Sequence, residues 1–316
     1  MSVPIPCGIG IGGAAVADEA SAEHGDAVRD VYLGQPERTR EITTTNISYS
    51  ATKMPHERDK PLLEIACFNE ESAISAAEAG ANRIELCHDY ASGGLSPDPA
   101  VLSALKSRLS IPICVMIRPH AKHFYYNNLD FEAMRTTLGA LDSCGADGFV
   151  FGILNQAVHD GSAPAPWIDV KRNKELVGLA RGKPCTFHRA FDCIPEPHWD
   201  TALSDIAECG FTSILTSGGP SGDQAIDCVD KLAALFQKSL PFLRPCIGEY
   251  QRVPEVIIGG GVRSSNVQLL WERTHAQSFH SSALLPSSQF GKQRASQAIL
   301  NTLLSSYTTE PGGRFI

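Results

Sequence analysis

The chain has 316 residues, 43% of them hydrophobic and 20% charged, and its formal net charge is −8. This length and composition are ample for a large hydrophobic core, and an α/β barrel takes about 200 to 250 residues as one domain. The negative charge excludes the basic surface that binds nucleic acid or anionic membranes. We therefore expect a small molecule or a metal ion as the partner, with no nucleic acid and no membrane.

Ten cysteines are spread along the chain without any C-x-x-C pair. This spacing matches neither a zinc framework nor a small secreted domain held by disulfides. Most of the cysteines lie in apolar runs, where a free thiol behaves as a small buried hydrophobe. The pattern favours a reducing, intracellular setting.

Residues 1–60 show no sustained helical or strand period and are rich in Gly, Pro, Thr and charge. This composition predicts a disordered N-terminal extension. Its GIGIGG run satisfies G-x-G-x-x-G, but no strand precedes it and no helix follows it, so we do not assign a dinucleotide site. The folded region is expected over 61–285, followed by a C-terminal tail over 286–316 with one possible helix.

From Pro61 onward, strand-like and helix-like segments alternate. The strand candidates are 62–66, 82–87, 112–119, 148–154, 185–191, 212–219, 255–262 and 277–283. The helix candidates are 70–80, 99–109, 130–145, 169–181, 198–210, 223–237 and 264–273. Eight such units predict a (β/α)8 TIM barrel, because parallel strands need helical crossovers. A doubly wound sheet is the alternative, but its Gly-rich first turn is missing from ACFNEES.

Two long insertions interrupt this alternation. Residues 155–168 follow the fourth strand and belong to the C-terminal face, where barrel sites lie. Residues 238–254 precede the seventh strand and belong to the N-terminal face, where a structural role is expected.

The segment CTFHRAFD brings three ionisable groups to the end of the fifth strand, namely His188, Arg189 and Asp192. Burying such groups is costly unless they are paired. The ends of barrel strands face a common site, so His188 is a candidate functional residue. Asp192 either caps the next helix or fixes an arginine. Arg189 alternates away from His188, which favours a bracing role toward Asp192.

Period-two alternation turns further polar groups into the barrel. The pairs that share an inward face are Thr186 with His188, Glu85 with Cys87, Met116 with Arg118, and Glu64 with Ala66. Glu64 lies near the start of its strand, where charges usually serve stability. If the protein is an enzyme, the candidate catalytic residues are Glu85, Arg118, His188, Arg189 and Asp192.

Glycine and small hydroxyl residues follow the last three strands, in TSGG, GGGV and HSSA. Exposed backbone N–H groups beside a helix start are how barrels hold phosphate or another anion. The possible anion site is formed by Ser217, Gly218, Gly259, Gly260 and Gly261, with a small anionic metabolite as the ligand. Tight turns that need a positive φ explain the glycines equally well.

The motifs ANRIELC, GGLSP, IRP, GADGFVFG, TFHRAFD, LTSGG, GGGVR and FHSSA occur in this order at strand ends. Over residues 62–283 they resemble the CutC copper-homeostasis family. The resemblance implies a TIM barrel, a cytoplasmic protein, self-association into a homo-oligomer, and copper(I) bound by cysteine.

Copper(I) is soft and prefers thiolate or thioether ligands. The resemblance implies Cys87 as a ligand, because it stands in the ELC position of the family. Ala66 occupies the position of the family's other cysteine, and Cys67 is the next residue. Alternation points the Cys67 side chain to the other face unless the strand bends. Met116 is a further soft donor.

A second departure from the family follows the third strand, where this chain has His120 and His123. These histidines either bind a metal or are solvated loop residues, and the solvated role is favoured.

Two functions therefore remain open. The first is a binding protein that holds copper(I) through Cys87 and Cys67 at the barrel mouth. The second is an enzyme whose His, Arg and carboxylate groups act on a small anionic or phosphorylated substrate. Because one barrel fold hosts many activities, the fold alone does not choose between them.

Overall fold

A computed structural model describes residues 61–157, 165–239 and 254–283, together with Asn301 and Ser305. The predicted extension over 1–60 lies outside the described residues. So do most of the insertion at 238–254 and, apart from those two residues, the tail over 286–316.

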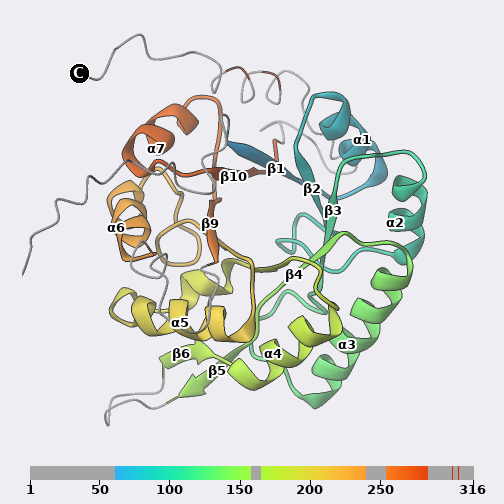
Figure 1. The fold of residues 1–316 in the computed structure, drawn as a ribbon, viewed down its shortest axis with the longest axis horizontal. Helices are drawn as coiled ribbons and strands as arrows, with labels where there is room; N and C mark the ends of the chain where they lie inside the picture. The colour runs from blue at the N-terminus through green and yellow to red at the C-terminus, as the bar shows by residue number, and fades with distance from the viewer. Residues whose placement is uncertain (1–60, 158–164, 240–253, 284–300, 302–304, 306–316) are drawn as a thin grey trace, which may run out of the picture. The chain divides into compact units, whose positions relative to one another are not determined.

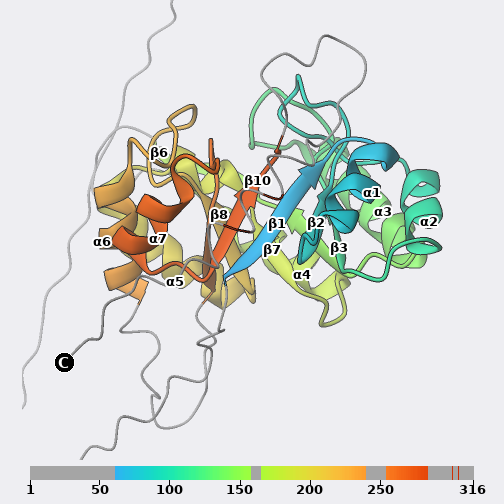
Figure 2. The ribbon, with the colours of Figure 1, turned by 90° about the horizontal axis from the view of Figure 1, so that it is seen from above.

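Eight parallel strands close into a barrel in the order β1-β10-β9-β8-β7-β4-β3-β2, with helices around it (Figure 1). The strands are β1 (Leu62–Cys67), β2 (Arg83–Leu86), β3 (Ile113–Met116), β4 (Gly148–Phe151), β7 (Cys185–Phe187), β8 (Ser213–Thr216), β9 (Glu255–Ile258) and β10 (Ser278–Ser281). Figure 2 shows β1 from the side, between β10 and β2. The predicted TIM barrel is confirmed.

The α-helices lie between consecutive barrel strands. They are α1 (Glu70–Glu78), α2 (Pro99–Lys106), α3 (Asn128–Ser143), α4 (Val170–Leu179), α5 (Trp199–Cys209), α6 (Val229–Ser239) and α7 (Val267–Thr274). No helix in the described part of the chain is both long and apolar enough to cross a membrane.

Local sequence signals start these helices where the alternation predicts them. The Asp98 side chain accepts the Ala100 N–H, and proline stands at the first position of α2. Asn127 and Asp130 form a reciprocal capping box at the start of α3. Each cap satisfies backbone N–H groups that the first helical turn leaves without partners.

Side-chain alternation along the strands builds two separate layers. Leu63 and Ile65 of β1 face outward and join the main core between the sheet and the helices. Cys114 and Met116 of β3 face inward and pack with Cys87 in a small cluster inside the barrel. This division follows from the two-residue period of a strand. The inward positions are therefore the ones available to a ligand.

The chain departs from the predicted elements after the fourth and fifth barrel strands. Residues 155–168, expected as an insertion, contain most of an antiparallel hairpin of β5 (Leu154–Ala157) and β6 (Ala165–Ile168). The fifth barrel strand stops at Phe187, and Arg189–Cys193 form a short 3₁₀ helix, η1. A second 3₁₀ turn, η2 (Glu196–His198), precedes α5.

Helix α6 also begins later than predicted, at Val229 instead of residue 223. The preceding residues form turns, and the Ala225 N–H donates to the Gly260 carbonyl. This bond ties the turns to the loop after β9.

Asn173 of α4 holds the chain where it leaves β4 for the hairpin. Its side-chain oxygen accepts the Ile153 N–H at 3.0 Å, and its amide nitrogen donates to the Ile153 carbonyl at 2.8 Å. Asn173 is fully buried. The Ile153 carbonyl also accepts the Asp169 N–H at 3.0 Å, so the Asn173 side chain is needed mainly as the acceptor for the buried Ile153 N–H.

We expect Asn173→Ala to lower the free energy of unfolding by about 1 to 3 kcal/mol, because it leaves the buried Ile153 N–H without its acceptor, while the Ile153 carbonyl keeps the Asp169 N–H. Urea denaturation of the full chain measures this loss. Asn155→Ala is the matched control, since Asn155 is exposed on the hairpin. Equal losses in the two variants would contradict the assigned role.

Candidate ligand pocket at the mouth of the barrel

A cavity of about 110 Å³ lies at the C-terminal ends of the strands. The structure brings five of the predicted site residues to its wall, namely Glu85, Cys87, Arg118, His188 and Arg189, together with the further soft donor Met116. Ala66 also lines it. The inward faces predicted for the strands therefore converge on one pocket.

Other sequence candidates lie outside the lining, including all five residues of the predicted anion site, Ser217, Gly218, Gly259, Gly260 and Gly261. Cys67 is fully buried in the outer core with Leu63 and Ile65, so β1 does not bend to turn it inward. Asp192 lies behind Arg189, and Glu64 lies deeper inside the barrel. The structure thus separates Cys67 from the cavity that Cys87 lines.

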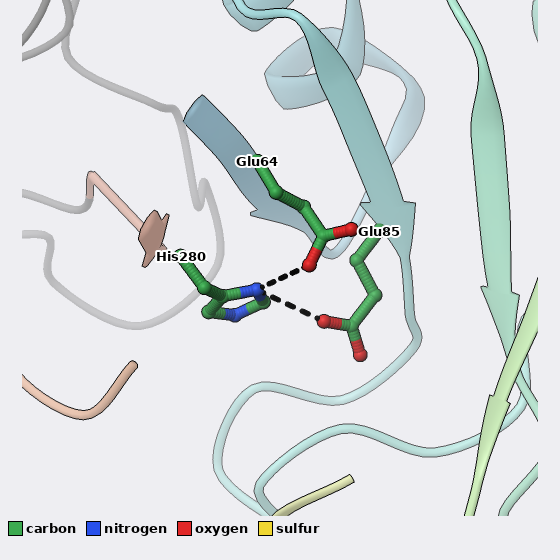
Figure 3. A group of neighbouring side chains, drawn as sticks. All are labelled: Glu64, Glu85 and His280. Carbon is green, nitrogen blue, oxygen red and sulfur yellow. Dashed lines mark hydrogen bonds and ion pairs between the residues drawn. The ribbon is translucent and has the colours of Figure 1, made fainter. Parts of the chain in front are cut away.

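A buried ion-pair network lies beneath the cavity and joins β1, β2 and β10 (Figure 3). The His280 Nδ1 atom lies 2.8 Å from Glu64 Oε1 and 3.2 Å from Glu85 Oε2. Arg83 donates to the other oxygen of Glu64. The stabilising role expected for Glu64 agrees with this pairing.

The charges in this network balance one another. Burial opposes ionisation of Glu64, but Arg83 and His280 outweigh it and lower its pKa to about 2. Burial also opposes protonation of His280, yet Glu85 and Glu64 raise its pKa. The pKa of Glu85 is raised by burial, which His280 partly offsets.

Glu64, Glu85 and His280 place one possible ligand atom each within 4.8 Å of the others. Arg83 and His280 already pair with Glu64, and His280 also pairs with Glu85, so protein groups supply partners for both carboxyl groups. We therefore interpret it as a structural network that closes the barrel and presents His280 to the pocket.

His188 is a neutral hydrogen-bond donor in the pocket. Its side chain is 3% exposed, and burial together with nearby Arg118 lowers its pKa to about 3. The Nδ1 atom accepts the Ala190 N–H at 3.3 Å at the start of η1, so the ring hydrogen belongs on Nε2. Nε2 is buried without a hydrogen-bond partner among the described residues.

Gly152 leaves the space that the His188 ring occupies. A Cβ atom at Gly152 would lie 2.7 Å from His188 Nδ1 and 3.0 Å from the Phe187 ring. Real Cβ atoms do not approach other atoms so closely. A glycine just after β4 is therefore a condition for the ring position after β7.

Arg118 is buried at the rim of the same pocket. Its Nη1 atom donates to the carbonyls of Ser92, Gly93 and Gly94, and Nη2 donates to Ala121. The guanidinium also packs on the Phe124 ring, 5.0 Å from its centroid. No carboxylate pairs with it among the described residues, and its buried Nε has no hydrogen-bond partner there.

Arg189 both lines the cavity and braces Asp192. Its Nε donates to Asp192 Oδ2 at 2.7 Å, and Nη2 donates to Ser217 Oγ at 3.0 Å. Asp192 also accepts bonds from Thr216 and from the Ser217 N–H and hydroxyl. Of the two roles considered for Asp192, the structure shows the fixing of an arginine.

Most of the glycine-rich loop residues are engaged in packing. The Ser217 N–H donates to Asp192, the Gly218 N–H to Thr216 Oγ1, and the Gly259 N–H to the Thr216 carbonyl. Gly260 has φ of +92°, and a Cβ there would lie 2.9 Å from the Ser217 side chain. These contacts favour turn geometry as the reason for the glycines. An anion site that also includes Gly261 stays a prediction.

The loop after β3 forms an aromatic cluster. The rings of His120 and His123 lie 5.3 Å apart, and His120 also packs on Tyr126. His120 Nε2 lies 3.4 Å from Asp130. His123 is exposed, whereas His120 is half-buried and its buried Nδ1 has no hydrogen-bond partner among the described residues, so the solvated role fits His123 but not His120.

Sulfur atoms line one side of the pocket. Cys87 and Met116 face the cavity, and Cys114 packs with both. Cys87 Sγ lies 3.5 Å from Glu85 Oε1, and burial and this carboxylate both raise the pKa of the thiol. Burial raises the pKa of Cys114 to about 12.

Sequence reasoning missed five lining residues, namely His280, Phe124, Phe68, Leu215 and Gly93. His280 stands in the quoted FHSSA motif. Its partner Glu64 is opposite it in the β1–β10 register, which becomes known only when the two strands are paired. Phe124 comes from a loop, where no periodicity indicates direction.

The described residues form a parallel β/α barrel with a pocket at the C-terminal ends of its strands. The family model for the CutC family matches residues 61–285. The chain therefore belongs to the CutC family.

Similar proteins support this assignment. The chain is 36% identical to the mouse copper homeostasis protein cutC homolog over 222 residues, 70% of this chain and 73% of that protein. It is 34% identical to the human homolog over 244 residues, 77% of this chain and 81% of that protein. A solved CutC structure from Streptococcus agalactiae has a TM-score of 0.61 and 27% identity, covering 70% of this chain and 98% of that one.

The lowered pKa of His188 predicts acid sensitivity. In the unfolded chain the imidazole protonates near its ordinary pKa of 6.5, whereas in the fold it stays neutral down to about 3. The contribution of neutral His188 to the free energy of unfolding is therefore complete above pH 6.5 and is lost as pH falls toward 3. Over this range the free energy of unfolding falls by up to about 1.4 kcal/mol per pH unit.

Urea unfolding of the parent and of His188→Gln across this range measures the slope. The variant should lose less stability on acidification. Met116→Leu, a change in the same pocket without a titrating group, should keep the slope of the parent. Parallel profiles for the parent and His188→Gln would show that the His188 ring protonates in the fold.

Proposed function

We propose that this protein binds copper(I) within the barrel, with Cys87 as the principal ligand and the Met116 thioether as a second donor. The observation that carries the proposal is that Cys87 and Met116 line the pocket together and pack with Cys114 in one cluster. Thiolate and thioether are the ligands that copper(I) prefers. The printed names of the mouse and human relatives, which describe copper homeostasis proteins, agree with this chemistry.

The sulfur donors fit copper(I) as cargo better than as a tightly held cofactor. Only one cysteine lines the cavity, because Ala66 stands where a second inward thiol would be offered by β1. Cys67 packs in the outer core instead, so we assign the site to Cys87 and Met116. A single thiolate with a thioether should bind less tightly than two thiolates do.

The second hypothesis, an enzyme acting on a small anion, keeps one point of support. Four of its five candidate residues line the cavity, and the fifth, Asp192, positions Arg189. A neutral histidine, an arginine and a carboxylate are the groups that acid–base chemistry on a carbonyl compound uses.

The copper proposal predicts that Cys87→Ser lowers copper(I) affinity by at least about tenfold. Losing a residue that only hydrogen-bonds a metal ligand already costs about that much, and losing the ligand itself should cost more. Ala66→Cys should raise the affinity, since it places a second thiol on the cavity wall. Competition with a chromophoric copper(I) chelator under anaerobic, reducing conditions measures both.

Two cysteine variants serve as controls. Cys185→Ser changes a buried cysteine of β7 in the outer core and should leave the affinity unchanged. Cys67→Ser should do the same if the structural placement decides the ligand. Parent-like affinity in Cys87→Ser would refute the proposed site, and a loss confined to Cys67→Ser would move it to the outer core.

A further inference from the structure

We infer that His188 and Arg118, which both line the pocket, form a binding site for the carboxylate group of a small organic acid. The inference deepens the enzyme hypothesis by naming its ligand class, and it does not depend on copper binding.

The first support is a pair of buried donors without acceptors. His188 Nε2 and Arg118 Nε are both buried and have no geometric hydrogen bond among the described residues, although the Tyr126 hydroxyl interacts with the Arg118 guanidinium. The two side chains are 3% and 8% exposed. Buried polar groups are nearly always hydrogen-bonded, so two such donors on one pocket wall indicate that a ligand supplies the acceptors.

The second support is charge. Arg118 donates to four backbone carbonyls, which are neutral, and no ion pair of this residue is found in the described part of the chain. A buried guanidinium without a counter-charge is unfavourable. An anionic ligand would compensate it, whereas a neutral ligand would not.

The third support is the placement of the two donors. Phe124 contacts both side chains, with its centroid 4.7 Å from the His188 ring and 5.0 Å from the Arg118 guanidinium carbon. The contacts with Phe124 hold the imidazole and the guanidinium on neighbouring parts of one wall. Two oxygens of one carboxylate present acceptors to two such donors.

The donor pattern favours a carboxylate over a phosphate. A phosphate needs hydrogen-bond donors around three oxygens, and the loop N–H groups of Ser217 and Gly218 already donate within the protein. The Glu85 carboxyl group lines the same pocket, so it would disfavour a ligand with two negative charges more than a ligand with one. Phe68 and Leu215 line the remaining wall and suit a short apolar body attached to the carboxylate.

The test is ligand binding to the full chain in metal-free buffer that contains a chelator. The probes are acetate, glycolate and pyruvate, with inorganic phosphate and sulfate as comparison anions. Thermal unfolding against ligand concentration and isothermal titration calorimetry give the affinities, because a ligand that binds only the folded state stabilises it. We expect at least one carboxylate to bind more tightly than phosphate or sulfate.

Variants locate the binding. His188→Leu removes the imidazole donor and should weaken carboxylate binding by about tenfold or more, while His188→Gln keeps a side-chain N–H and should retain more of it. Arg118→Lys keeps the charge but loses the planar fork, so it should also bind more weakly. Arg135→Gln removes an exposed arginine charge on α3 and should bind as the parent does.

Far-ultraviolet circular dichroism and unliganded melting temperatures show whether each variant is folded. The proposal is overturned if no carboxylate binds the parent at about millimolar concentration. It is equally overturned if folded His188→Leu and Arg118→Lys bind as tightly as the parent. Tighter binding of phosphate than of every carboxylate would contradict the donor-count argument.

Discussion

The ion pair between Glu64 and His280 joins the first strand of the barrel to the last, and the barrel is closed along this seam. Closure places carboxylates in an interior that is poor in water, where an unpaired charge would be costly. Arg83 and His280 together compensate Glu64 and Glu85. These ion pairs give Glu64 and Glu85 their partners within the protein. The buried donors His188 Nε2 and Arg118 Nε, which have no hydrogen-bond acceptor among the described residues, belong to residues at the strand ends.

Much of this arrangement could be predicted from sequence because it depends on a property of the backbone. The two-residue period of a strand places Cys87, Met116 and His188 inward, whatever the loops do. The same period kept Cys67 outward, in agreement with its place in the outer core. These predictions needed only the strand positions.

Other features depend on contacts between distant segments, which periodicity does not reveal. His280 is separated from Glu64 by 216 positions, so its role was visible only once the strands were paired. Arg189 was expected to alternate away from the site, but the turn into η1 after Phe187 lets it both brace Asp192 and reach the cavity. The β5–β6 hairpin carries a proline and weak alternation, and its anchor is Asn173 on the next helix.

The walls of the pocket differ in chemical character. Cys87 and Met116 offer soft, polarisable sulfur, whereas His188 and Arg118 offer hard N–H donors. A soft cation and an oxyanion are opposite kinds of ligand, and one small cavity presents surfaces suited to each. The two proposals therefore concern different atoms of the same site and can each stand without the other.

The close approach of Gly152 to the His188 ring has an evolutionary consequence. Gly152 is not part of the pocket lining. A side chain there would nevertheless displace the His188 imidazole, which does line the pocket. Selection that retains His188 for ligand binding would therefore also retain glycine at position 152, just after the neighbouring strand. In related barrels without a histidine at the position of His188, the glycine at the position of Gly152 would no longer be required. The two positions should therefore covary.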